Sequence, residues 1–157
     1  MEVRQGFTLI ELLVVIVIVG LVGGIATVIL STTLQNASKG EMTREVKQNG
    51  DFALSIMERM IRNATGISSC PGSSFELTIT NPDGKNSTFS LSGPQIASNG
   101  GMLTSSKLTA SNLSFSCTLT PGRPGFVVVT FNLTGGGSRP SERARMDFRT
   151  SVSLRTY

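Results

Sequence analysis

The most constraining feature of the chain is an uncharged apolar run that extends from Leu12 to Leu30. Thr27 is the only polar side chain among these 19 residues. A helix rises about 1.5 Å per residue, so a run of this length matches the roughly 30 Å hydrocarbon core of a bilayer. The run therefore predicts a segment that enters a membrane at some stage.

Two kinds of N-terminal segment carry such a run, and the residues before it distinguish them. An ordinary secretory signal peptide leads from a basic region directly into its apolar stretch, and Gly24-Ile25-Ala26 does provide a small-x-small cleavage site. Here, however, a leader ending at Gly6 is followed by Phe7-Thr8-Leu9-Ile10-Glu11, which places a carboxylate where the apolar stretch begins. Because an unpaired carboxylate costs about 2 to 3 kcal/mol at membrane depth, we expect Glu11 to have a cationic partner.

The six residues from Gly6 to Glu11 match the class III signal of the type IV pilin superfamily, which this segment closely resembles. The resemblance implies that a prepilin peptidase cuts after Gly6 on the cytoplasmic side and methylates the new amino group of Phe7. It also implies that Glu11 pairs with the Phe7 amino terminus of a neighbouring subunit in a filament. The alternative is that Glu11 merely extends to the lipid headgroups. Arg4 and the initiator amine favour a cytoplasmic leader and an exported remainder.

The helix is predicted to continue beyond the apolar run as an amphipathic segment. From Leu34 to Ala64 apolar residues recur at intervals of three and four, with charged residues on the other faces. Gly40 and Asn49-Gly50-Asp51 are weak points where this helix could bend or restart with Asp51 as its N-cap, and its end is predicted at residues 63–66. We therefore divide the chain into a leader (1–6), a transmembrane or filament-core helix (7–30), its amphipathic continuation (31–66) and a head domain (67–157).

Beyond Cys70 apolar residues recur at every second position, which is typical of half-buried antiparallel strands. The predicted inward-facing residues are Phe75, Leu77 and Ile79; Phe89 and Leu91; Leu113, Phe115, Cys117 and Leu119; Val127, Val129, Phe131 and Leu133; and Met146, Phe148, Thr150, Val152 and Leu154. Asn81-Pro82-Asp83-Gly84 predicts a tight turn between the first two strands, and residues 92–107 and 134–141 are predicted to be loops. The expected fold is α+β, with the long helix packed against a single antiparallel sheet of four to five strands.

Cys70 and Cys117 are the only cysteines, one after the predicted helix and one within a predicted strand. An even pair in an exported domain predicts a disulfide, worth about 3 to 4 kcal/mol by loop-closure arguments, whereas the alternative is two buried free thiols. A metal site is not expected at the cysteines, because no other soft ligand is near in sequence. Asn81, Asp83 and Asn86 offer oxygen ligands for calcium, but their spacing favours a simple turn.

Arginines dominate the outward-facing positions of the last predicted strand. Arg143, Arg145, Arg149 and Arg155 have the opposite parity to its apolar residues and so form a basic stripe. The stripe could contact another subunit, nucleic acid or anionic lipid, or it could simply be solvated. Nucleic acid is the weaker partner, because no aromatic residues are interleaved for base stacking. The ending RMDFRTSVSLRTY also resembles the C-terminal strand of minor pilins and of the J-type minor pseudopilins of type II secretion.

The absence of histidine excludes serine–histidine and cysteine–histidine catalysis and imidazole metal sites. We therefore expect a non-enzymatic structural subunit, without a cofactor or metal, of a pilus or of a secretion or competence pseudopilus. Its expected partners are prepilin peptidase, other pilin-like subunits and the bacterial cytoplasmic membrane, which it leaves for an extracellular or periplasmic filament. The unbalanced arginines and long loops favour a minor, initiating subunit. The alternatives are a major pilin and a membrane-tethered adhesin or DNA-binding module that uses the pilin signal.

Overall fold

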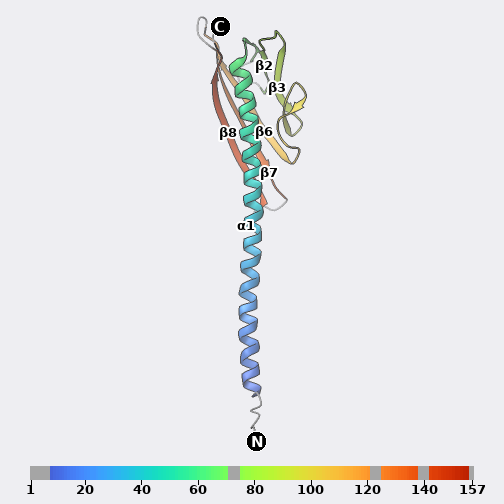
Figure 1. Ribbon diagram of the computed structural model, residues 1–157, viewed down its shortest axis with the longest axis vertical. Helices are drawn as coiled ribbons and strands as arrows, with labels where there is room; N and C mark the ends of the chain where they lie inside the picture. The colour runs from blue at the N-terminus through green and yellow to red at the C-terminus, as the bar shows by residue number, and fades with distance from the viewer. Residues whose placement is uncertain (1–7, 71–74, 121–124, 138–141, 156–157) are drawn as a thin grey trace. The chain divides into compact units, whose positions relative to one another are not determined.

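The computed structural model describes residues 8–70, 75–120, 125–137 and 142–155 (Figure 1). The chain divides into two compact units, Met1–Ser38 and Lys39–Tyr157. The element order is α1 (Leu9–Asn63), β1 (Gly66–Ser69), β2 (Leu77–Thr80), β3 (Asn86–Ser92), β4 (Gln95–Ser98), β5 (Gly101–Met102), β6 (Leu108–Thr118), β7 (Phe126–Gly135) and β8 (Ala144–Ser153).

The first unit is formed by the uncovered start of α1. The large apolar side chains from Leu9 to Leu34 are between 48% and 83% exposed. Among the described residues, α1 is the one helix long and apolar enough to cross a membrane, and its most apolar 18-residue window has a mean hydropathy of 3.0. Valine and isoleucine are mediocre helix formers in water, but in lipid a helix satisfies every backbone polar group of such a segment. The exposed surface therefore indicates a lipid or helix-packed environment.

α1 continues without interruption over 55 residues and ends at Asn63, where its end was predicted. The predicted restart at Asn49-Gly50-Asp51 is therefore wrong. Gly50 is buried instead, and a Cβ placed on it would lie within 3.0 Å of the Phe148 ring. The glycine thus permits a close approach of β8 to the helix. Asn49 also has a tertiary role, because its Oδ1 accepts a hydrogen bond from the Ser105 amide at 3.0 Å.

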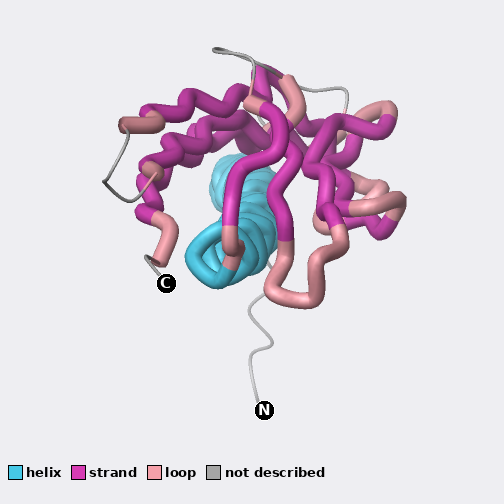
Figure 2. The backbone as a smooth tube through the Cα atoms, turned by 90° about the horizontal axis from the view of Figure 1, so that it is seen from above, coloured by secondary structure: helices cyan, strands magenta, loops and turns pink. Residues whose placement is uncertain are grey.

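The second unit contains two antiparallel sheets, in the orders β1-β2-β3-β4-β5 and β6-β7-β8. The α+β class is confirmed, but the single sheet of four to five strands is wrong. The short strands β4 and β5, of four and two residues, pair with each other and, among the described residues, form no ladder with β6, so the first sheet does not continue into the second. The two sheets meet where the Ala110 amide of β6 donates to the Pro94 carbonyl at 2.7 Å. Figure 2 shows the strands curving around the part of α1 that belongs to this unit.

Residues 92–107, predicted to be a loop, contain β4 and β5. Tight reversals make these short strands possible, since Gly93, Asn99 and Gly100 have positive φ angles of 59°, 49° and 84°. The predicted loop at 134–141 begins later than expected, because β7 reaches Gly135, and residues 138–141 lie outside the described residues. The predicted turn between β2 and β3 is confirmed, with Gly84 donating to the Asn81 carbonyl at 3.0 Å.

The core lies between one face of α1 and the inner faces of both sheets. Its buried helix residues are Val46, Ala53, Met57 and Ile61, and its larger strand residues include Leu77, Ile79, Phe89, Ile96, Leu113, Phe115, Val127, Val129, Phe131, Leu133, Phe148 and Val152. The alternation used in the prediction is therefore confirmed for most positions. Phe75 and Leu119 are exceptions, because they lie outside β2 and β6 and are 69% and 59% exposed.

Candidate functional site: the N-terminal segment and the β8 arginines

The junction predicted to be cleaved and methylated, Gly6-Phe7, lies outside the described residues. The described chain begins at Thr8, and α1 starts at the next residue. The Thr8 hydroxyl accepts a hydrogen bond from the Glu11 amide at 3.4 Å, so Thr8 caps the helix. Helix α1 therefore starts immediately beyond the predicted cleavage junction.

Glu11 lies in the first turn of α1 and is exposed. A carboxylate at this end of a helix interacts favourably with the unpaired amides and the helix dipole. No salt bridge to Glu11 is found within the described ranges of this single chain. The cationic partner expected for Glu11 is therefore not among the described residues, and the pairing stays a prediction.

The capping role of Thr8 was not among the sequence predictions, although a signal for it was present. Thr8 and Glu11 have the Thr-x-x-Glu spacing of a capping box, in which residues three apart satisfy free amides at a helix start. Only the bond from the Glu11 amide to the Thr8 side chain is seen among the described atoms. The same four residues thus start the helix and present the carboxylate.

Cys70 and Cys117 form a disulfide with a Cα–Cα distance of 6.3 Å, which confirms the predicted bond. The bond closes a separation of 47 residues and connects the end of β1 to β6. It therefore fastens the first sheet, which follows the helix directly, to the second sheet. The disulfide has a structural role, and closing a loop of this length stabilises the folded state by about 4 kcal/mol.

The four predicted stripe arginines are all exposed, but only Arg145 and Arg149 lie within β8. Arg145 is 3.9 Å from Asp147, and Asn132 also donates a hydrogen bond to that carboxylate. Arg143 donates a hydrogen bond through Nε to the Gly137 carbonyl at 3.0 Å. Four arginines against one aspartate leave the row with an excess of three positive charges.

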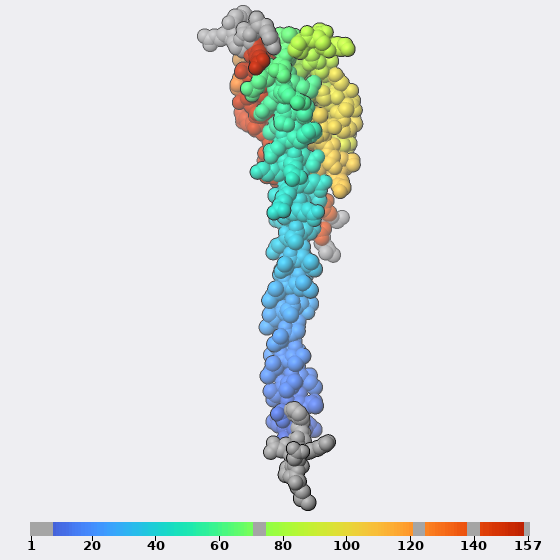
Figure 3. Space-filling view, in the orientation of Figure 1, coloured from blue at the N-terminus to red at the C-terminus, as the bar shows by residue number. Residues whose placement is uncertain are grey.

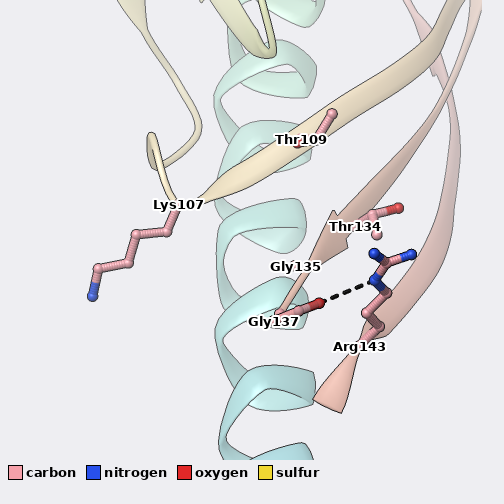
Figure 4. A pocket seen from close by; sticks show the side chains of 7 residues that line it. Lys107, Thr109, Thr134, Gly135, Gly137 and Arg143 are labelled. Atoms are coloured by element: carbon pink, nitrogen blue, oxygen red, sulfur yellow. Dashed lines mark hydrogen bonds between the residues drawn. The ribbon is translucent and has the colours of Figure 1, made fainter. Parts of the chain in front are cut away.

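An open cavity of about 370 Å³ lies at one end of the second sheet (Figure 4). Its lining residues are Lys107, Thr109, Thr134, Gly135, Gly136, Gly137 and Arg143. In Figure 4 the Lys107 ammonium group is directed away from the Arg143 guanidinium group. Among the described lining residues, the two cations do not converge on a common point.

Of the three residues considered for calcium, Asn81 and Asp83 lie in the β2–β3 turn and Asn86 is the first residue of β3. Asp83 Oδ1 accepts a hydrogen bond from the Lys85 amide at 3.0 Å, and Asn81 Nδ2 donates to Ser87 Oγ at 2.8 Å. Asn86 Oδ1 lies within hydrogen-bond distance of Ser68 and Thr80 across neighbouring strands. These contacts support the interpretation of the segment as a turn. In the described part of the chain, no three histidine, cysteine, aspartate or glutamate residues are grouped as a metal site would require.

Comparison with known proteins assigns the N-terminal segment and leaves the head domain unassigned. A family model for the prokaryotic N-terminal methylation motif matches residues 1–27. No curated protein and no solved structure shows significant similarity to the chain. The matched range contains Gly6, Phe7, Thr8 and Glu11 together with most of the apolar run. This chain therefore carries the class III signal peptide of type IV pilins, the hallmark of a pilin-like prepilin.

Proposed function

We propose that this protein is a structural subunit of a type IV pilus or a related pseudopilus. The observation that carries the proposal is the methylation motif at residues 1–27, continued by a helix whose apolar surface is uncovered. Exposed apolar area of this size is stable only in lipid or against other helices. Before assembly this apolar surface would lie in lipid. After the subunit has left the membrane, the surface would pack against other helices in the filament core.

Processing by prepilin peptidase follows from the motif, and cleavage between Gly6 and Phe7 would create a new amino terminus next to the helix cap. In the proposed filament this amine, methylated on Phe7, pairs with Glu11 of a neighbouring subunit. The pairing would offset the desolvation of both charges and would set the axial register between adjacent helices. The exposure of Glu11 and its lack of an ion pair within the described ranges support this role.

The apolar helix and the signal motif fit a membrane anchor with an exported domain. Before assembly, the subunit would cross the bacterial cytoplasmic membrane once. The Cys70–Cys117 disulfide supports export, because such bonds form and persist in oxidising compartments. We infer that the domain boundaries lie near residues 6, 30 and 66, with residues 67–157 forming the head.

We further propose a minor rather than a major subunit. A major subunit repeats one set of lateral contacts with copies of itself along the whole filament, so charges on one patch must be matched by opposite charges on another patch of the same chain. The β8 row carries an excess of three positive charges and only one acidic residue, Asp147. A surface of this kind fits contacts with different subunits better than contacts with copies of itself.

Quantitative mass spectrometry of purified filaments tests this function. The expected result is a mature chain that begins at methylated Phe7 and is present in trace amounts together with other minor subunits. Absence from filaments and from their assembly intermediates would refute the subunit role. A stoichiometry equal to that of the most abundant pilin would instead refute the minor assignment alone.

A further inference from the structure

Strand β8 is the outer strand of the second sheet, and one of its two edges has no partner strand within the described ranges. Its other edge pairs with β7 through ten consecutive residues, from Ala144 opposite Gly135 to Ser153 opposite Phe126, without a register shift. At about 3.4 Å per residue, the unpaired edge is roughly 30 Å long. The red strand is visible along one side of the head in Figure 3.

The ladder geometry identifies the backbone groups that face this free edge. The Leu154 amide donates to the Gly125 carbonyl at 2.9 Å, so even-numbered residues of β8 are directed toward β7. Because hydrogen-bonding direction alternates along an antiparallel strand, odd-numbered residues direct their N–H and C=O groups away from it. The Arg155 amide confirms the alternation, since it donates at 3.3 Å to the Arg62 carbonyl of α1. The five free positions are Arg145, Asp147, Arg149, Ser151 and Ser153, all of which are exposed.

The other sheet edges do not offer a comparable template. The β6 edge is interrupted by a register shift between Ser111 and Ser114, and its Ala110 amide donates to the carbonyl of Pro94, just before β4. The strands β1 and β5 have only four and two residues. Proteins commonly protect an edge by shortening it, by a bulge or by proline. β8 has ten residues, no register shift, no proline and no glycine. Its charged side chains are the remaining protection, and they exclude cationic strands while favouring anionic ones.

The side chains at the free positions define the partner by charge. Residues with edge-facing backbone groups also place their side chains on the outer face, so Arg145 and Arg149 would lie opposite same-face residues of an added strand. Asp147 is already engaged by Arg145 and Asn132. An added strand with carboxylates at alternate positions would therefore meet arginines with its side chains and free amides with its backbone.

A second copy of this chain matches the edge poorly. The strands β1 and β5 contain no acidic residue, and β8 itself contains only Asp147. Two copies of β8 could at best oppose each Asp147 with one arginine and would leave the other arginines of both copies without a carboxylate. The charge therefore points to a different polypeptide.

We propose that the free edge of β8 binds an extended acidic segment of another polypeptide, which becomes the fourth strand of the second sheet. The identification of that polypeptide as another subunit of the same assembly rests on the proposed function. The strand addition itself rests only on the ladder, the length and the charge of β8.

Peptide binding to the full chain in detergent micelles tests the pairing. The probe is a peptide of about twelve residues in which glutamate alternates with threonine, and a second peptide has lysine in place of glutamate. We expect the glutamate peptide to bind at least about tenfold more tightly. We also expect it to slow amide exchange at the free positions of β8. Equal binding of the two peptides, or unchanged exchange at these positions, would overturn the proposal.

Backbone methylation of the peptide separates strand pairing from simple ionic attraction and leaves the protein unaltered. In an antiparallel addition, glutamates that lie opposite the arginines on the outer face direct their amides to β8, and the threonine amides face away. N-methylation at the glutamates should therefore weaken binding by about tenfold or more, since it removes several backbone hydrogen bonds at once. The same modification at the threonines should leave binding nearly unchanged. Equal effects of the two modifications would refute strand addition.

A matched pair of variants tests the protein side. Ser151→Pro removes one edge-facing amide and is compatible with an edge strand whose N–H points away from the ladder, whereas Ser151→Ala keeps the amide. We expect about fivefold weaker binding for Ser151→Pro and no change for Ser151→Ala, with circular dichroism confirming the fold of both. Arg149→Glu should reduce the preference for the acidic peptide. Sedimentation that shows a dimer resistant to this peptide would refute the heterologous partner.

The assay also separates this inference from the proposed function. Normal incorporation into filaments together with no peptide pairing would refute strand addition at β8 and leave the subunit role intact. Peptide pairing by a chain that is absent from filaments would refute the subunit role and leave the edge with a partner of another kind.

Discussion

The two units of the chain differ in what covers their apolar side chains. Residues of the first unit from Leu9 onward expose almost every apolar side chain, whereas the second unit buries its apolar side chains in a core shared by α1 and two sheets. The first unit is thus stable only in an environment that other molecules provide. The second unit is stabilised by its own contacts and by a disulfide. Substitutions in the first unit should therefore alter processing and assembly, and substitutions in the second should alter folding stability.

The largest effect is expected at the processing junction. Gly6→Val should block cleavage completely, because a branched side chain would prevent an extended backbone from entering a crowded protease cleft. Mass spectrometry should detect only the full-length precursor in the membrane. Gln5→Ala is the matched control, since it changes the leader and retains Gly6. A normal mature N-terminus at Phe7 in Gly6→Val would contradict the assignment of the junction.

Glu11→Ala should separate processing from assembly. The variant lowers the cost of membrane insertion, so insertion and cleavage should be normal. Incorporation into filaments should fall by about tenfold or more, because the Phe7 amine of the neighbour would lose its charged partner. Thr8→Ala serves as a control for the helix start, since it removes the cap and keeps the carboxylate. Normal incorporation of Glu11→Ala would refute the pairing.

The second unit should respond to loss of its disulfide. Replacing Cys70 and Cys117 together by serine should lower the free energy of unfolding by about 4 kcal/mol, as expected for a closed loop of this length. Urea unfolding of the full chain in detergent micelles, followed by circular dichroism, measures the change. Cleavage at Gly6 should be unaffected, because the junction belongs to the other unit. A change in free energy below about 1 kcal/mol would show that the two sheets hold together without the bond.

The two units also differ in how much of them the sequence predicts. Gly6, Phe7 and Glu11 belong to a pattern of six adjacent residues, and this local pattern was sufficient to predict the methylation motif that the family model matches at residues 1–27. Alternation along β6, β7 and β8 was equally local, and most of their inward residues were predicted correctly. The division into two sheets was not predicted, because β4 and β5 are too short to show an alternation of apolar and polar residues. Their pairing depends on positive φ angles at Gly93, Asn99 and Gly100, which several turn types share.

Gly50 shows the same limit of prediction from the sequence, within a single helix. Its neighbours Asn49 and Asp51 made the position appear to be a helix boundary, because all three residue types are common at helix ends. Its actual role depends on Phe148, which lies almost a hundred positions away in the chain. A glycine selected for close contact and a glycine at a break have the same local sequence. Only the tertiary structure distinguishes them.

The smallest predicted effect tests this distinction with one substitution made at two sites of α1. Alanine at Gly40 meets nothing within 4 Å, so Gly40→Ala should stabilise the chain by about 0.5 to 1 kcal/mol through helix propensity alone. Alanine at Gly50 gains the same propensity, but its Cβ would fall within 3.0 Å of three atoms of the Phe148 ring. The ring is stacked on Phe131 with centroids 5.1 Å apart, so it cannot move without disturbing β7. Overpacking of this kind costs about 1 to 3 kcal/mol, and Gly50→Ala should therefore destabilise the chain slightly. Urea unfolding of both variants in micelles shows whether each substitution raises or lowers the free energy of unfolding. If both substitutions stabilised the chain, Gly50 would be an ordinary helix glycine and the close packing of β8 on α1 would be refuted.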